Sequence, residues 1–160
     1  MPNKMFREEY FKIQHSQYLK KVAKSYFSDN WIYFVLPILM CFSLGAINVN
    51  FIIVALMLLF VAAPMVLNLI YFYYMLTVEA SWSVTDKVIS VDKDGNLTLS
   101  FANENRLSKT IKREEIAGVT GDADSVILLF AIRKYTFLVI PYSHFISKDA
   151  VADFVAIYRS

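Results

Sequence analysis

The sequence predicts an α+β membrane protein, in which a hairpin of two transmembrane helices precedes a small antiparallel β-barrel or sandwich closed by a C-terminal helix. Three observations predict this class. Residues 30–78, 49 in a row, contain no Asp, Glu, Lys, Arg or His. After them, short β-rich segments alternate with turn sequences. The chain then ends in a segment whose apolar residues have helical spacing.

The uncharged run has the length of two spans. About 20 apolar residues cross the bilayer core as one helix, so 49 residues suit two helices and a turn. Asn48-Val49-Asn50 marks the turn, which leaves spans near 31–47 and 51–76. The first span is short and is expected to include the turn or to thin the bilayer locally. Pro64 is expected to kink the second span, and Asn68 to hydrogen-bond the neighbouring helix.

Flanking residues predict the orientation of this hairpin. Trp31 and Tyr33 open the run and aromatic residues 71–74 close it, as is typical of headgroup-level rings. Lys and Arg occur before and after the run but not in the turn, so both termini are expected in the cytoplasm. Cys41, the only cysteine, would lie in lipid. Small residues in the second span leave homodimerisation through the helices open: Ala55, Ala62 and Ala63.

Residues 1–29 form a juxtamembrane segment, and 8–27 are predicted to be an amphipathic helix. Its aromatic and apolar face comprises Phe11, His15, Tyr18, Leu19, Val22 and Tyr26, whereas Lys20, Lys21 and Lys24 lie outside it. Ile13 breaks this pattern. The helix either lies in the interface with its lysines toward anionic lipid or packs its aromatic face on the C-terminal domain. His15 is expected to be a packed ring rather than a ligand.

Residues 79–160 form one small domain. Strands are predicted at 82–85, 87–91, 97–101, 107–112, 116–120, 126–132 and 135–140, with turns at 92–95 and 121–124. Ser147 is the predicted N-cap of the closing helix, with Asp149 in its first turn. Two strands, 126–132 and 137–140, are apolar on both faces and need a cover. The closing helix is the expected cover; headgroups, the N-terminal helix or a partner protein are the alternatives.

A short pattern runs through the C-terminal domain: Glu115-Ile116 and Val119, then an apolar hairpin, then Ile140-Pro141 with Phe145 and the closing helix. With this pattern after a two-span hairpin, the chain resembles the YcxB-like family of small bacterial membrane proteins. The chain differs from the family at Arg113, where tryptophan is common, and at Tyr142-Ser143, where a basic pair is common. The resemblance implies a pleckstrin-homology-like domain and a multi-pass location in the bacterial inner membrane, and it implies no reaction.

Signatures of catalysis and of cofactor binding are missing from the sequence. One cysteine and two distant histidines do not suit a transition-metal site, and Asp92-Lys-Asp-Gly-Asn96 lacks the remaining ligands of a calcium loop. A phosphate-binding glycine loop, a nucleophile elbow and a basic stripe for nucleic acid are not found either. His144 beside Ser143 and near Asp149 is the one weak triad candidate. We therefore expect a protein without enzymatic activity and without a cofactor.

Basic residues give the one indication of a ligand. The tentative ligand or membrane-surface contacts are Lys109, Lys112, Arg113, Arg133, Lys134, Lys20, Lys21 and Lys24. The expected function is a binding or regulatory module at the cytoplasmic membrane surface, whose ligand is a protein or a lipid headgroup. The alternative is an immunity protein that protects the cell against a membrane-active toxin or bacteriocin. A third hypothesis, a membrane-bound hydrolase, depends on His144.

Overall fold

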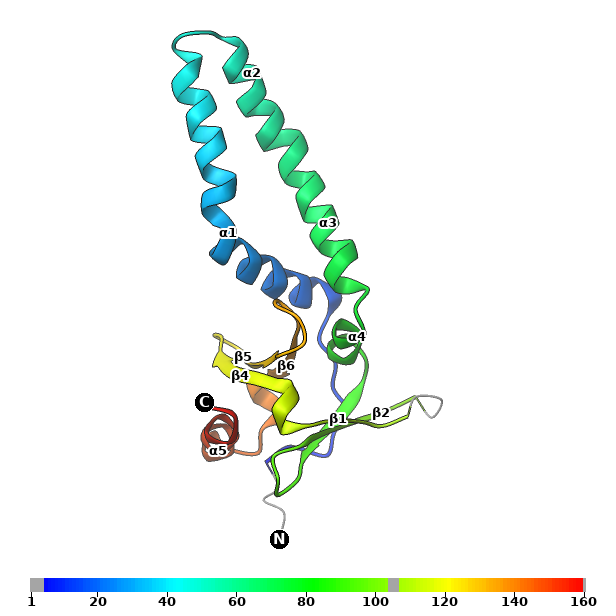
Figure 1. Ribbon diagram of the computed structural model, residues 1–160. Coiled ribbons are helices and arrows are strands. Elements are labelled where there is room, and N and C mark those ends of the chain that lie inside the picture. Colours follow the sequence, from blue (N-terminus) through cyan, green and yellow to red (C-terminus); the bar gives the residue numbers. More distant parts are fainter. Residues whose placement is uncertain (1–4, 104–106, 160) are drawn as a thin grey trace. The chain divides into compact units, whose positions relative to one another are not determined.

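Figure 1 shows the computed structural model, which describes residues 5–103 and 107–159. The chain is α+β and divides into two compact units. One unit joins the chain up to Tyr18 to the chain from Thr77, and the other comprises Leu19–Leu76. The first unit is therefore built from two segments that are far apart in sequence.

The Leu19–Leu76 unit contains long apolar helices. Helix α1 spans His15–Gly45, and α2 (Asn50–Met57), the π-helix η1 (Leu58–Ala62) and α3 (Ala63–Met75) follow as one continuous helical run. Both α1 and the run Asn50–Met75 are long and apolar enough to cross a membrane. Most of their large apolar side chains are exposed, which suits lipid contact better than a water-facing surface. The turn between them lies where the sequence predicted it, and Asn48 Oδ1 accepts the N–H of Asn50 (3.0 Å).

Pro64 and Asn68 shape the second long helix. Pro64 has no N–H to donate to the preceding turn, and η1 ends at Ala62, two residues before it. The prediction that Asn68 bonds the neighbouring helix was wrong. Its amide nitrogen donates to the carbonyl of Pro64 (3.0 Å), one turn earlier in the same helix.

The helix predicted at 8–27 begins only at His15, and the described residues before it are not helical and form isolated β-bridges at Phe6 and Phe11. We call Met5–Ile13 the strap. The N–H of Phe11 donates to the Lys87 carbonyl (3.0 Å), and the Lys87 N–H donates back (2.9 Å). Phe11 and Ile13 are buried on either side of exposed Lys12, so Ile13, which broke the helical pattern, fits the period of a strand. The expectation for His15 was also wrong, because it is exposed.

The other end of the strap pairs with the chain near the closing helix. The N–H of Arg7 donates to the carbonyl of His144 (2.9 Å), and the N–H of Ile146 donates to the carbonyl of Met5 (3.1 Å). Phe6 lies 4.9 Å from the ring of Phe145, centroid to centroid. The strap thus ties Lys87 to the C-terminal segment. Its aromatic side chains pack on the strand-rich unit, which was one of the two alternatives expected for the N-terminal segment.

Two antiparallel sheets of three strands each form the β part of the described chain. The first has the order β1 (Lys87–Val91), β2 (Leu97–Phe101), β3 (Lys109–Ile111), and the second has the order β4 (Ile116–Gly121), β5 (Ser125–Phe130), β6 (Phe137–Pro141). A bulge interrupts the pairing of β4 with β5 between Ile116 and Gly118. Short 3-10 turns, η2 (Arg113–Glu115) and η3 (Tyr142–His144), precede β4 and follow β6. The sequence predicted a barrel or a sandwich, and neither sheet closes into a barrel.

The segment predicted as strand 82–85 belongs instead to helix α4 (Val78–Val84). Thr77 caps this helix, because its Oγ1 accepts the N–H of Ala80 (3.2 Å), and Glu79 lies in the first turn. Ala80 and Ser83 are buried, so packing of this short segment outweighs its β-rich composition. Ser83 Oγ donates to the carbonyl of Phe137 (3.1 Å) and fixes α4 against β6.

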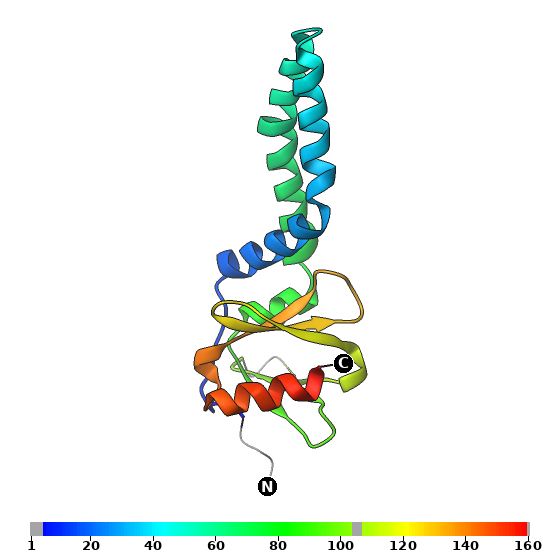
Figure 2. The same cartoon turned by 90° about the vertical axis from the view of Figure 1, so that its left-hand side faces the viewer.

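The two faces of the sheet β4–β6 have different covers. Leu138 and Ile140 belong to the main core with both sheets, the strap and α5 (Lys148–Tyr158). Phe137 and Val139 point to the opposite face, where α4 and Tyr18 pack. Figure 2 shows α5, in red, and α4, in green, on opposite sides of this sheet. The expectation that the closing helix covers the second face was therefore wrong.

Candidate functional site

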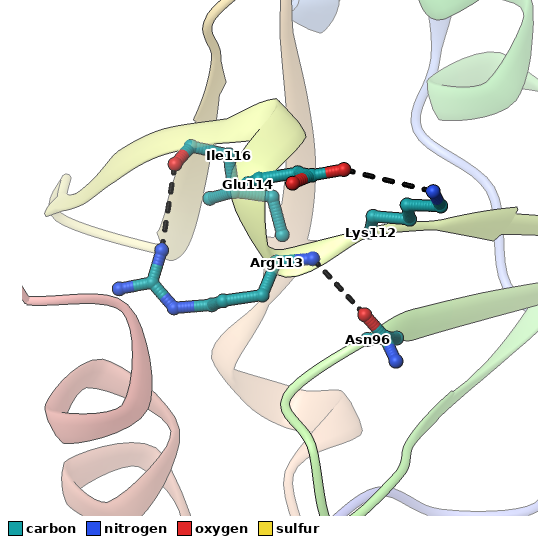
Figure 3. Close-up of a pocket in the computed structure, with 5 residues that line it drawn as sticks. All are labelled: Asn96, Lys112, Arg113, Glu114 and Ile116. Carbon is teal, nitrogen blue, oxygen red and sulfur yellow. Dashed lines mark hydrogen bonds and ion pairs between the residues drawn. The ribbon is translucent and has the colours of Figure 1, made fainter.

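Two of the predicted basic residues line a pocket beside the start of β2 and the end of β3. Its volume is about 560 Å³, and its lining residues, shown in Figure 3, are Asn96, Lys112, Arg113, Glu114 and Ile116. Lys112 and Arg113 come from the link between the two sheets, and Asn96 comes from the turn before β2. The pocket therefore lies where the two sheets meet along the chain.

The turn at 92–96 positions Asn96. Asp92 Oδ1 accepts the N–H groups of Asp94 (2.9 Å) and Asn96 (2.8 Å), and Asp92 Oδ2 accepts from Asn96 Nδ2 (2.9 Å). These bonds to the charged form, above all the one from the Asn96 side chain, hold the pKa of Asp92 below its usual value. Gly95 adopts φ 78° in this turn, a conformation that favours glycine. Asn96 Oδ1 then accepts the N–H of Arg113 (3.1 Å).

Arg113 is held in one orientation by neutral groups. Its Nε donates to the carbonyl of Ile157 (3.1 Å), Nη1 lies 3.5 Å from the carbonyl oxygen of Ile116, and the guanidinium lies 5.2 Å from the ring centroid of Tyr158. Tyr158 is itself anchored, because its hydroxyl donates to the carbonyl of Gly95 (2.9 Å). Among the described residues, no carboxylate forms an ion pair with Arg113. A fixed guanidinium whose charge is unpaired suits a carboxylate or a phosphate.

Lys112 and Glu114 form the outer rim of the pocket. Lys112 Nζ lies 3.6 Å from Glu114 Oε1, and both side chains are largely exposed. The carboxylate of Glu115 accepts the N–H of Lys112 (2.9 Å) and caps the 3-10 turn. Figure 3 shows the side chains of Lys112 and Arg113 pointing away from each other. Arg113 is therefore the cation that the pocket fixes, and Lys112 contributes a solvated charge.

The remaining basic candidates do not converge on this pocket. Lys109, on β3, lies with its Nζ 5.9 Å from the ring centroid of Trp82. Arg133 and Lys134 are exposed in the turn between β5 and β6. Lys20, Lys21 and Lys24 lie on α1. Of the eight predicted contacts, Lys112 and Arg113 therefore line this pocket.

A second polar cluster was missed by the sequence analysis. Lys87 is fully buried, and its Nζ donates to the carbonyl of Ser83 (2.8 Å) and lies 4.3 Å from the ring centroid of Phe11. Burial lowers the pKa of Lys87 to about 7, and neighbouring Asp86 opposes this effect. Its place at the start of a strand gave no signal of burial, because the strap that covers it lies more than 70 residues earlier.

His144 also contacts Phe11 of the strap. The two rings stack with 4.0 Å between their centroids. Burial lowers the pKa of His144. Nδ1 is buried and lacks a hydrogen-bond partner in the part of the chain that the structure describes. A triad needs a carboxylate that orients the imidazole, so the geometry gives the hydrolase hypothesis no support.

Metal-ligating side chains do not gather anywhere in residues 5–103 and 107–159: no group of three His, Cys, Asp or Glu there could hold a metal ion. Comparisons of the chain with family models, with curated proteins and with solved structures find no match.

Proposed function

We propose that the protein is a non-enzymatic binding module of the bacterial inner membrane. In this proposal the hairpin anchors it with both termini in the cytoplasm, and the strand-rich unit, pleckstrin-like in its role, binds an acidic segment of a partner protein. The two long apolar helices and the distribution of basic residues around them support the location. The resemblance to the YcxB-like family supports the bacterial origin.

The observation that carries the proposal is the guanidinium of Arg113, which is fixed and forms no ion pair with any residue that the structure describes. Its side chain is already ordered by Ile157, Ile116 and Tyr158, so binding an anion costs little further conformational entropy. The pocket before it is open to a side chain of the size of Asp or Glu. A carboxylate that reaches Arg113 would gain a charge-assisted hydrogen bond.

The neighbouring strand favours a protein over a small molecule as the source of this carboxylate. Strand β3 is an edge strand, and it leads directly through Lys112 into the pocket. An extended peptide can pair with an exposed sheet edge through its main chain while one side chain enters an adjacent pocket. By contrast, the bulge at Ile116–Gly118 disturbs the edge strand β4 of the other sheet.

Site-specific photocrosslinking in native membranes tests this proposal. We would place benzoylphenylalanine at Ser108, an exposed residue next to β3, and at Ala117, an exposed residue of the β4 bulge, as the matched control. We expect one discrete protein adduct from Ser108, an acidic segment at its crosslinked site, and no such adduct from Ala117. Equal adducts at both positions, or none at Ser108, would contradict the proposal.

Variants that remove one charge show whether Arg113 takes part in binding the crosslinked partner. Arg113→Gln is expected to reduce the Ser108 adduct about tenfold, whereas Lys112→Gln removes the same charge from a solvated side chain and should retain most of it. Equal loss in both variants would show general electrostatic attraction and overturn the role of the pocket. If the crosslinked partner is a membrane-active toxin, the result would support the alternative function, an immunity protein.

A further inference from the structure

The turn between β5 and β6, residues 131–136, combines an exposed apolar side chain with two exposed basic ones. Ile132 is 63% exposed, and Arg133 and Lys134 follow it. An isolated exposed isoleucine has little meaning by itself. At the tip of a turn, next to two cations, it has the composition of segments that enter the headgroup region of anionic membranes.

The backbone of this turn is fixed. The Thr136 hydroxyl donates to the carbonyl of Arg133 (2.7 Å), the N–H of Phe130 donates to the carbonyl of Thr136 (3.2 Å), and the N–H of Ala131 donates to the carbonyl of Glu115 (2.9 Å). Tyr135 has φ 65°, which is rare for a residue other than glycine and is often found where a turn has a function. The turn therefore presents Ile132 and its basic neighbours in a set arrangement.

The opposite end of β5 carries the opposite charge. The turn between β4 and β5, residues 122–124, contains Asp122 and Asp124. Strand β5 has 6 residues, so the two turns are separated by about 20 Å. A negatively charged surface attracts the basic turn and repels the acidic one, so it would orient the sheet with residues 131–136 toward it.

The basic turn also lies near the two points at which the chain leaves and re-enters the strand-rich unit. Phe137 directly follows the turn, and its carbonyl accepts from the hydroxyls of Tyr18 (3.3 Å) and Ser83 (3.1 Å). Tyr18 is the last residue of its unit before the first long helix continues, and Thr77 is the first residue after the second. From Thr77 to Ser83 the chain advances only about 9 Å as helix α4.

We propose that the β5–β6 turn is a lipid-contact site, at which Ile132 enters the headgroup region of an anionic bilayer and Arg133 and Lys134 bind its phosphate groups. In this proposal the bilayer is the one in which the apolar helices of the same chain lie. The lipid contact uses none of the residues of the Arg113 pocket, and it goes beyond the proposed recognition of a partner protein.

Fluorescence of a probe at the turn tests this inference on the full chain in lipid nanodiscs. Ile132→Cys in a Cys41→Ala background carries an environment-sensitive nitrobenzoxadiazole label, and Ala123→Cys, in the exposed acidic turn, is the matched control. Discs contain either phosphatidylcholine alone or equal parts phosphatidylcholine and phosphatidylglycerol. Quenching by headgroup-level spin-labelled lipid reports contact.

With phosphatidylglycerol present, we expect quenching at position 132 to rise about threefold and to fall again at high salt. Position 123 should not respond. Arg133→Gln with Lys134→Gln, which leaves the backbone bonds of the turn in place, should abolish the rise. Equal quenching in both lipids, an equal response at position 123, or a rise that survives the double substitution would overturn the inference. Label burial that appears only with a bound protein would assign the turn to a protein partner and would also overturn it.

Discussion

Lys87 shows how one buried residue can make stability depend on pH. Its ammonium is stabilised by the carbonyl of Ser83 and the ring of Phe11, but these contacts do not offset the loss of water, and its pKa falls to about 7. In the unfolded chain a lysine has a pKa of about 10.4. Between these values the unfolded chain binds more protons than the native one, so the free energy of unfolding rises with pH.

We therefore predict that Lys87 lowers stability at neutral pH. Raising the pH from 7 to 9 should increase the contribution of Lys87 to the free energy of unfolding by about 2 kcal/mol. Lys87→Met keeps the length of the side chain and should remove this dependence; the carbonyl of Ser83 keeps a partner in the N–H of Ile13. Urea titration followed by Trp82 fluorescence in a Trp31→Phe background measures it. A pH slope that Lys87→Met leaves unchanged would exclude Lys87 as its source.

Gly95 holds the pocket together through its backbone. A Cβ at this position would meet Cγ2 of Ile157 at 3.3 Å and Cδ of Arg113 at 3.4 Å, and φ is 78°. Gly95→Ala should cost about 1–2 kcal/mol from the left-handed backbone alone and should displace Arg113, which weakens the Ser108 crosslink. Gly118→Ala is the control, since a Cβ there meets nothing within 4 Å. Thermal unfolding compares the two variants, and equal loss of stability would contradict the prediction.

At the scale of elements, the sequence predicted strands and turns better than short helices. The alternation of Leu97, Leu99 and Phe101 with polar residues identified β2, because one face of that strand is buried and the other is not. Residues 82–85 contain Trp, Val and Thr, which favour strands, yet they form part of α4 or end it. The capping residue Thr77 was the available signal, and it was overlooked because it lies inside the uncharged run.

The strap was missed for a related reason. Phe11, Tyr18 and Val22 are spaced to suit a helix face, and only Ile13 contradicted that interpretation. Whether residues 5–13 form the strap or a helix depends on pairing with Lys87 and His144, which lie far along the chain. Local periodicity does not contain that information. The same limit applied to the candidate site: sequence singled out Lys112 and Arg113, but the bonds that fix Arg113 come from Ile157 and Ile116.

Asn68 gives a prediction for the helical run. Because its side chain bonds the Pro64 carbonyl within its own helix, Asn68→Leu should change the stability of the hairpin by less than about 1 kcal/mol. Gly45→Val is the comparison, since a Cβ at Gly45 would lie 2.5 Å from Cγ1 of Ile52 across the turn, and it should destabilise the hairpin more. Titration of the micelle-bound chain with dodecyl sulfate, followed by helicity, measures both. A large loss for Asn68→Leu would indicate an interhelical bond after all.

At the scale of the whole molecule, the chain places its two apolar helices inside the sequence of another folded unit. The strand-rich unit needs residues from both sides of them: Phe6 and Phe11 belong to its core together with Leu97, Leu128 and Phe154. Burying two phenylalanines contributes several kcal/mol, at about 1.5–3 kcal/mol for each fully buried side chain. That contribution is comparable to the whole stability of a small domain.

This organisation predicts which fragments fold. A chain that begins at Thr77 contains both sheets but lacks the strap, and it should be loosely packed or unfolded. A chain in which a short Gly/Ser linker replaces Leu19–Leu76 should fold in water, because the hydroxyls of Tyr18 and Ser83 meet at the same Phe137 carbonyl and the cut ends are therefore within reach of a linker. Amide dispersion in NMR spectra distinguishes the two. If the fragment from Thr77 were as well dispersed as the linked chain, the strap would be dispensable, and the buried contacts of Phe6 and Phe11 would contribute little to the fold.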